Sequence, residues 1–253
     1  MMKSALLTKT MAAVLLFFSM SCGVLAGEVT VAVASNFLEA AQKIVKQFKE
    51  KTGHQVYLVN GSTGALFAQI SNGAPYDVFL SADQARILRL KHAEKLLDET
   101  HKTYALGKLV LFAKDGAYLC GDIKTSIESK RTRHFAMADP ATAPYGLAAQ
   151  QVLERLGLLD RIKDKAVVGV NIGQAFGFVA TGNAQVGFVA LSQAMQSKGD
   201  WIAVSDDLYV PIVQEAGLLL HSKGNEAARE FYDFLSSKPI QSMLQSSGFE
   251  VPK

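Results

Sequence analysis

The stretch VTVAVASNFLEAAQKIVKQFKEKTGHQVYLV, residues 29–59, contains the repeating unit from which we predict the fold. It begins with an apolar, β-branched run at Val29–Ala34 and ends with a second run at Gln55–Val59. Between these runs, apolar residues recur at helical spacing from Phe37 to Phe48, with Lys and Gln on the opposite face. A strand, an amphipathic helix and a second strand together predict a β-α-β unit.

The same alternation continues along the rest of the chain. Further strands are predicted at residues 77–80, 109–113, 134–138, 166–170 and 186–191, with helices from 65, from 83, and over 147–156 and 174–181. The tail differs, since an extended segment at 211–220 precedes two closing helices at 225–236 and 239–246. Alternation of this kind indicates an α/β fold with mostly parallel sheets, whose ligands lie beyond the carboxyl ends of the strands.

The first 26 residues have the pattern of a targeting segment. A lysine-bearing start, an apolar run over 12–18 and a small-residue motif ending at Ala26 predict a secretory signal peptide over residues 1–26. We therefore expect the mature chain to work in the periplasm. Lipidation of Cys22 is the less favoured alternative, because Ser19 stands where a lipoprotein signal carries an apolar residue.

Charge and cysteine content narrow the function classes. Removing the signal peptide takes away two lysines and no acidic residue, so the formal charge falls from +3 to about +1. A near-neutral chain argues against nucleic acid as a partner, because nucleic acid requires a strong basic patch. Cys120 would then be the only cysteine, which leaves no intramolecular disulfide.

Four predicted strand-to-helix junctions are rich in small polar residues: Ser35–Glu39, Gly61–Gly64, Asp139–Gly146 and Asn171–Gln174. At the first junction we expect Asn36 and Glu39 to form a capping box. At the third we expect Pro144 near a first helical turn, and at the fourth we expect Asn171 and Gln174 to form another cap-and-Gln pair. None of the four contributes a Lys, Arg or His, so a site built from them would be electrically neutral. Helix N-termini nevertheless carry about half a positive charge each and present free N–H groups.

These junctions offer enough hydroxyl and amide donors to complete a shell around one anion. The candidate donors are Ser35, Asn36, Ser62, Thr63 and Tyr145. Monohydrogen phosphate still carries a proton, and its O–H would meet another donor, at a cost of ~1–3 kcal/mol for the unpaired group. A neutral donor shell therefore favours sulfate-like or molybdate-like dianions over phosphate.

Several longer stretches identify a family. They are VAVASNFLEAA (31–41), GSTGALFAQISNGAPYDVFLSAD (61–83), YALGKLVLFAK (104–114), PATAPYGLAAQQVL (140–153), NIGQAF (171–176) and VGFVAL (186–191). These stretches resemble the periplasmic molybdate-binding proteins of ABC transporters, and the resemblance covers essentially the whole mature chain. The most specific of them is NGAPYDVFLSAD (72–83), which is close to a signature of that family.

The resemblance implies a two-lobed, type II periplasmic-binding-protein fold with an oxyanion in the cleft between the lobes. By position, the implied ligand contacts are Ser35, Asn36, Ser62, Thr63 and, through backbone N–H groups, Tyr145 and Ile172. Some relatives place a ligand-binding Tyr where this chain has Ala190. Those relatives lack an Asn after the first-strand Ser, so Asn36 is expected to supply the donor here.

We expect one lobe to span residues 27–108 and 213–253, and the other to span 109–212. Molybdate, or tungstate of nearly the same size and charge, would bind between the lobes and favour their closed state. The closed monomer would deliver it to an inner-membrane ABC permease. No cofactor and no direct ligation of the metal atom are expected.

Two alternatives remain open. The first is a binding protein for sulfate or a small organic anion. The second and less favoured one is an enzyme, because the five histidines form no H-x-x-x-H pair and nothing matches G-x-S-x-G. The polar stretch Ser81–Gln84 is better explained as a Ser/Gln capping box than as a catalytic motif.

Overall fold

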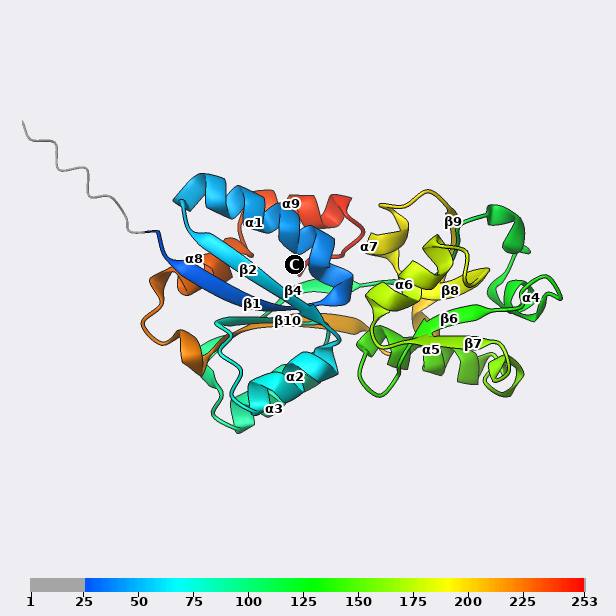
Figure 1. Cartoon of the computed structure of the whole chain (residues 1–253), viewed down its shortest axis with the longest axis horizontal. Helices are drawn as coiled ribbons and strands as arrows, with labels where there is room; N and C mark the ends of the chain where they lie inside the picture. Colours follow the sequence, from blue (N-terminus) through cyan, green and yellow to red (C-terminus); the bar gives the residue numbers. More distant parts are fainter. Residues whose placement is uncertain (1–25, 253) are drawn as a thin grey trace, which may run out of the picture.

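The computed structural model describes residues 26–252, and its strands form two separate five-stranded sheets (Figure 1). The two sheets and their helices lie side by side along the longest axis of the molecule. The predicted signal peptide, apart from Ala26, lies outside the described residues, and so does Cys22. Within residues 26–252, no helix has the length and apolar character needed to cross a membrane.

The first sheet has the strand order β2-β1-β3-β10-β4. Its strands are β1 (Glu28–Ala34), β2 (Gln55–Gly61), β3 (Val78–Ser81), β4 (Leu96–Gly107) and β10 (Ile212–Leu219). Its helices are α1 (Leu38–Thr52), α2 (Thr63–Ser71), α3 (Gln84–His92), α8 (Glu226–Phe234) and α9 (Lys238–Ser246). Helices α1, α8 and α9 cover one face of this sheet, while α2 and α3 cover the other.

The second sheet has the strand order β7-β6-β8-β5-β9. Its strands are β5 (Leu109–Ala113), β6 (Phe135–Ala138), β7 (Ala166–Gly169), β8 (Val186–Ala190) and β9 (Asp200–Ala203). Its helices are α4 (Ile123–Glu128), α5 (Pro144–Arg155), α6 (Ile172–Ala180) and α7 (Leu191–Ala194). Helix α5 packs on one face, and α6 and α7 pack mainly on the other.

Both sheets are mixed in the same way. In the first, β1 pairs in parallel with β2 and β3, whereas β10 runs antiparallel to both β3 and β4. In the second, β6 pairs in parallel with β7 and β8, whereas β5 runs antiparallel to both β8 and β9. Four strands of each sheet therefore point in one direction, which confirms the predicted α/β class with mixed, mostly parallel sheets.

The chain passes between the two sheets twice, at neighbouring positions. Strand β4 ends at Gly107, and β5 begins two residues later; the returning chain joins the first sheet at Ile212, which pairs with Gly107. Between the two strands, Lys108 forms ion pairs with Asp206 (2.6 Å) and Glu250 (3.1 Å). Adjacent crossings of this kind can act as a hinge. The residues that divide the two lobes stay a prediction.

In the first half, outside the polar junctions, one expected cap is wrong and one strand was not predicted. The capping box predicted for Ser81 and Gln84 does not form, because Asp83 caps α3 by accepting the Arg86 N–H at 2.9 Å. The twelve-residue strand β4 was not predicted, because polar residues interrupt its apolar pattern. Its pairing with β10, which is distant in the sequence, stabilises it. Predicted helices and strands elsewhere begin or end within a few residues of those in the structure.

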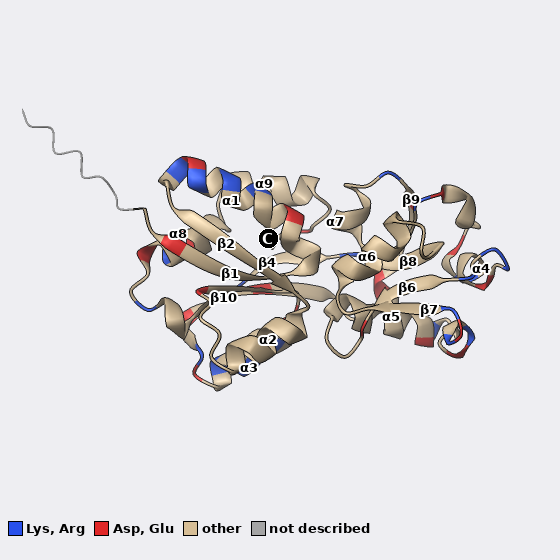
Figure 2. Ribbon diagram, in the orientation of Figure 1, with Lys and Arg blue, Asp and Glu red and all other residues tan. Residues whose placement is uncertain are grey.

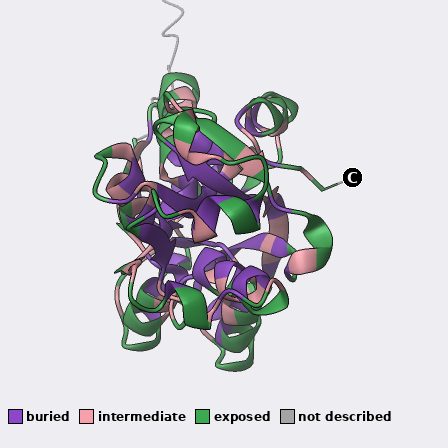
Figure 3. Ribbon diagram, turned by 90° about the vertical axis from the view of Figure 1, so that its right-hand side faces the viewer, coloured by how far each residue is buried: buried purple, intermediate pink, exposed green. Residues whose placement is uncertain are grey.

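The buried face of α1 packs on β1 and forms the core of the first half. Figure 3 shows that buried residues concentrate in the interior strands, while exposed residues cover the outer helices and loops. Phe48 on α1 is 1% exposed, and its ring centroid lies 5.3 Å from that of Phe231 and 5.5 Å from that of Phe234. This aromatic cluster joins α1 to α8, so a helix from the carboxyl-terminal part of the chain is needed to complete the core.

Phe48→Ala is expected to lower the free energy of unfolding by about 3–5 kcal/mol, because it leaves a cavity among these rings. Chemical denaturation of the mature protein would measure the loss. Leu88→Ala on α3, whose side chain is exposed, is the control and should change stability by less than about 0.5 kcal/mol. Equal effects of the two substitutions would contradict the packing described here.

Candidate functional site

The four polar junctions meet at one small cavity between the two halves of the molecule. Its lining residues are Ala34, Ser35, Asn36, Ser62, Thr63, Ala82, Ala143, Pro144, Tyr145, Asn171 and Ile172. All six predicted site residues are among them, although their binding role stays a prediction. The cavity volume is about 10 Å³, which is room for about one water-sized group. Pockets for organic ligands usually start at roughly 300 Å³.

A larger hollow, with a volume of about 490 Å³, lies between α3 and β4. Its lining includes Lys91, Glu94 and Asp98, and it receives no residue from the second sheet. Because its charges are of both signs and it contacts one half only, we assign the functional site to the smaller cavity.

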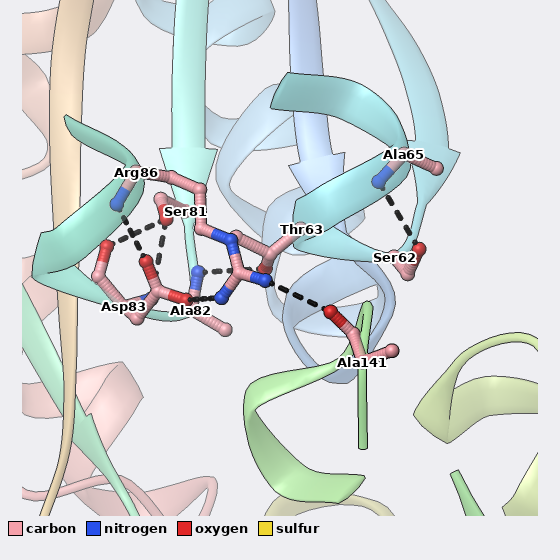
Figure 4. Close-up of polar contacts among 8 residues, drawn as sticks. All are labelled: Ser62, Thr63, Ala65, Ser81, Ala82, Asp83, Arg86 and Ala141. Atoms are coloured by element: carbon pink, nitrogen blue, oxygen red, sulfur yellow. Dashed lines mark hydrogen bonds and ion pairs between the residues drawn. The ribbon is translucent and has the colours of Figure 1, made fainter. Parts of the chain in front are cut away.

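The turn after β2 supplies two hydroxyl groups with protons free to donate (Figure 4). Ser62 Oγ caps α2 by accepting the Ala65 N–H at 3.3 Å. Thr63 Oγ1 accepts the Ala82 N–H at 3.1 Å. A hydroxyl that accepts from the backbone keeps its own O–H for another partner. Both side chains can therefore act as donors toward the cavity.

Ser35 is arranged differently from the other two hydroxyl residues. Its Oγ donates to the Gly61 carbonyl oxygen at 2.9 Å, so its proton is used within the protein. This bond ties the end of β1 to the end of β2. A ligand would receive the Ser35 hydroxyl proton only after that bond rearranges.

Asn36 does not form the predicted capping box with Glu39. Residues Ser35–Phe37 form a 3₁₀ turn before α1 begins, and Phe37 occupies the N-cap position without a side-chain hydrogen bond. The Asn36 amide is 4% exposed; its Nδ2 donates to Gln214 Oε1 at 2.8 Å and lies 3.5 Å from Tyr145 Oη. Asn36 therefore links the end of β1 to both β10 and α5.

The second half contributes two helix N-termini. Pro144 and Tyr145 are the first two residues of α5, and Ile172 is the first residue of α6. Asn171 caps α6 by accepting the Gln174 N–H at 3.0 Å, as the sequence predicted. First-turn N–H groups have no acceptor within their own helix, and they lie at the positive end of the helix dipole. The backbones of Tyr145 and Ile172 are therefore suited to hold an anion.

Within residues 26–252, the side chains that line this cavity are all uncharged. Figure 2 shows that charged residues gather on outer helices and loops, α1 among them. Arg86 bridges the two halves by donating to the Ala141 carbonyl at 3.3 Å, but its charge is paired with Asp83 (Figure 4). Burial raises the pKa of the Tyr145 hydroxyl above its usual value, so this group stays neutral at physiological pH.

Hydrogen bonds beside the cavity join the two halves directly. The Gly64 N–H donates to the Thr142 carbonyl at 2.9 Å, and Ser192 Oγ donates to the Asn36 carbonyl at 3.2 Å. A Cβ atom at Gly64 would lie 2.9 Å from the Thr142 carbonyl oxygen and 3.0 Å from its Cα. The two halves are therefore in direct contact beside the cavity, and the close approach at Gly64 requires a glycine.

Sequence reasoning missed two buried polar residues next to the cavity, Gln214 and Tyr104. Tyr104 Oη lies 3.1 Å from Gln214 Oε1, and burial raises its pKa well above the usual value. The available signal was a Gln-Glu pair inside the otherwise apolar segment 211–220. Only the pairing of β10 with β4 shows that this segment passes beside the site.

The chain matches a family model described as bacterial extracellular solute-binding protein over residues 29–250. It is 41% identical to the molybdate-binding protein ModA of Azotobacter vinelandii, over 91% of this chain and 92% of that protein. It is 42% identical to the molybdate-binding protein ModA of Rhodobacter capsulatus, over 88% of each chain.

The fold is also similar to a solved structure, the periplasmic molybdate-binding protein of Azotobacter vinelandii. The TM-score is 0.84 at 35% sequence identity, and the match covers 89% of this chain and 100% of that one. These similarities confirm the resemblance that the sequence motifs indicated. The chain belongs to the family of bacterial extracellular solute-binding proteins.

Proposed function

We propose that this protein binds molybdate, or tungstate, as an intact oxyanion and delivers it to an inner-membrane ABC permease for import. The observation that carries the proposal is the uncharged cavity at which the N-termini of α2, α5 and α6 converge. The molybdate-binding names of the similar proteins from Azotobacter and Rhodobacter support the choice of anion.

The chemistry of the cavity favours a fully deprotonated anion. Hydroxyl protons of Ser62 and Thr63 and the first-turn N–H groups of Tyr145 and Ile172 would all donate to it. Ser35 and Asn36 would join once their present bonds to Gly61 and Gln214 rearrange. A molybdate or tungstate dianion accepts hydrogen bonds on every oxygen. Hydrogen phosphate would place its O–H against a donor and leave that group unpaired.

Binding between the two halves also gives a delivery mechanism. We infer lobes of residues 27–108 with 213–253 and of residues 109–212, joined by the adjacent crossings at Gly107 and Ile212. An anion that touches both lobes favours the closed state, which a permease can distinguish from the open one. The mature chain would act as a periplasmic monomer after removal of residues 1–26, and it would make or break no bond in its ligand.

Sulfate is the second candidate ligand, because it is also a fully deprotonated tetrahedral dianion. A small organic anion fits less well, because it is larger than a tetrahedral oxyanion and would require the cavity of about 10 Å³ to widen further.

A thermal-shift titration of the mature protein with molybdate, tungstate, sulfate and phosphate tests the proposed ligand. Molybdate or tungstate at about 100 times its dissociation constant should add about 2.7 kcal/mol of stability, whereas phosphate should add none. Stabilisation by sulfate or phosphate without stabilisation by molybdate would show that the ligand is wrong.

Gly64→Ala tests the closed binding mode. The added methyl group would meet the Thr142 backbone, so the lobes should close incompletely and molybdate affinity should fall at least about tenfold. Small-angle scattering with saturating molybdate should give a larger radius of gyration than for the wild type. Gly177→Ala on α6, where the methyl group enters open space, is the matched control. Equal affinities for the two variants would rule out this mode of closure.

A further inference from the structure

Two buried carboxamides face each other beside the anion cavity. Asn36 Nδ2 donates to Gln214 Oε1 at 2.8 Å, and the two residues are 4% and 0% exposed. The other polar atom of each amide, Asn36 Oδ1 and Gln214 Nε2, has no hydrogen-bond partner among the described residues. Buried polar atoms rarely lack a hydrogen bond. Here two neighbouring side chains each have one such atom, an acceptor on Asn36 and a donor on Gln214, and this requires an explanation.

The two ends of a carboxamide have nearly the same shape, so the group can turn by half a turn in place. If both amides turn together, their mutual hydrogen bond is kept with its direction reversed. Gln214 Nε2 then donates to Asn36 Oδ1, and the Asn36 NH₂ group takes the side where Oδ1 stood. Asn36 lines the cavity, and Gln214 and Tyr145 occupy its present Nδ2 side, so the freed NH₂ group turns toward the anion.

Tyr104 supports the turned arrangement independently. Its hydroxyl has one proton but two acceptors within reach, Gln214 Oε1 at 3.1 Å and the Ser81 carbonyl at 3.3 Å. After the turn, the Gln214 NH₂ group would face Tyr104 Oη and donate to it. Tyr104 Oη would then donate its proton to the Ser81 carbonyl alone. Gln214 would donate to Tyr104, and Tyr104 to the backbone, so each group would have one defined partner.

The backbone around Gln214 is adapted to hold this side chain. The register between β10 and β4 shifts between Gln214 and Glu215, and such irregularities commonly redirect a side chain next to a site. At Gly107, opposite β10, a Cβ atom would lie 2.0 Å from Tyr145 Oη and 3.1 Å from Gln214 Nε2. A glycine at this position therefore leaves space for both side chains.

We propose that Gln214 is a positioning residue for anion selection, which turns together with Asn36 so that Asn36 presents only N–H groups to the ligand. The inference rests on the proposed function. By donating to Asn36 Oδ1, Gln214 keeps this carbonyl away from the anion. The other side-chain carbonyl that lines the cavity, that of Asn171, already accepts the Gln174 N–H. A protonated anion then finds no free carboxamide oxygen to accept its proton. Without Gln214, the Asn36 carbonyl can turn toward the ligand and accept such a proton.

Gln214→Met tests this role, because methionine has a similar length but cannot donate to Asn36. Calorimetric titrations would measure the affinities for molybdate and for monohydrogen phosphate. Molybdate affinity should fall about tenfold, and phosphate affinity should stay the same or rise, so the molybdate-to-phosphate ratio should fall at least about tenfold. Tyr104→Phe should shift the ratio in the same direction by less. Gln69→Met, an exposed glutamine on α2, is the control.

A Gln214→Met variant that binds both anions more weakly by the same factor, or that keeps the wild-type ratio, would overturn this inference alone. A wild-type protein that binds no molybdate would overturn the proposed function and this inference with it. If the variant does not fold, neutron diffraction from wild-type crystals grown with molybdate can show which Asn36 atom faces the anion. Deuterium on the Asn36 atom that faces the anion supports the proposal, and the Asn36 oxygen in that place contradicts it.

Discussion

The proposed ligand, a buried dianion, has to meet hydrogen-bond donors on every side, and the elements around the cavity are arranged to meet this requirement. A single helix N-terminus offers donors from one direction only. In this fold, α2 approaches the cavity from one half, and α5 and α6 approach it from the other. Each of these helices follows a parallel strand, so all three helix N-termini lie at the carboxyl ends of strands. Ligands of such sheets bind at this edge.

An uncharged donor shell also suits a protein that has to release what it binds. An arginine or lysine left in a closed, empty cavity would be a buried charge without a partner, which is strongly unfavourable. Hydroxyl and backbone N–H groups leave no such charge behind. The contacts beside the cavity, such as Gly64 with Thr142, are likewise neutral hydrogen bonds. The charged donors that bridge the halves, Arg86 and Lys43, bond to uncharged oxygens. Opening of the proposed lobes would therefore separate no buried opposite charges.

The sequence predicted those parts of the candidate site whose signals are local. The glycine turn before Thr63, the Pro144–Tyr145 helix start and the Asn171 cap are short motifs, and the structure brings them to one cavity. The Asn36 capping box was wrong because a buried, long-range partner, Gln214, binds the amide that a local cap would have used. Tyr104 and Gln214 were missed for the same reason: no local pattern records which strands pair 110 residues apart.

Diffraction from crystals grown with molybdate, recorded at wavelengths on either side of the molybdenum absorption edge, tests the central claim most directly. We expect one anomalous peak in the cavity, with oxygens of the anion within hydrogen-bonding distance of Thr63 and of the Tyr145 and Ile172 backbone N–H groups. No Lys, Arg or His should contact it. A peak beside Arg86 or in the hollow near Lys91, with the cavity free of molybdenum, would contradict the account.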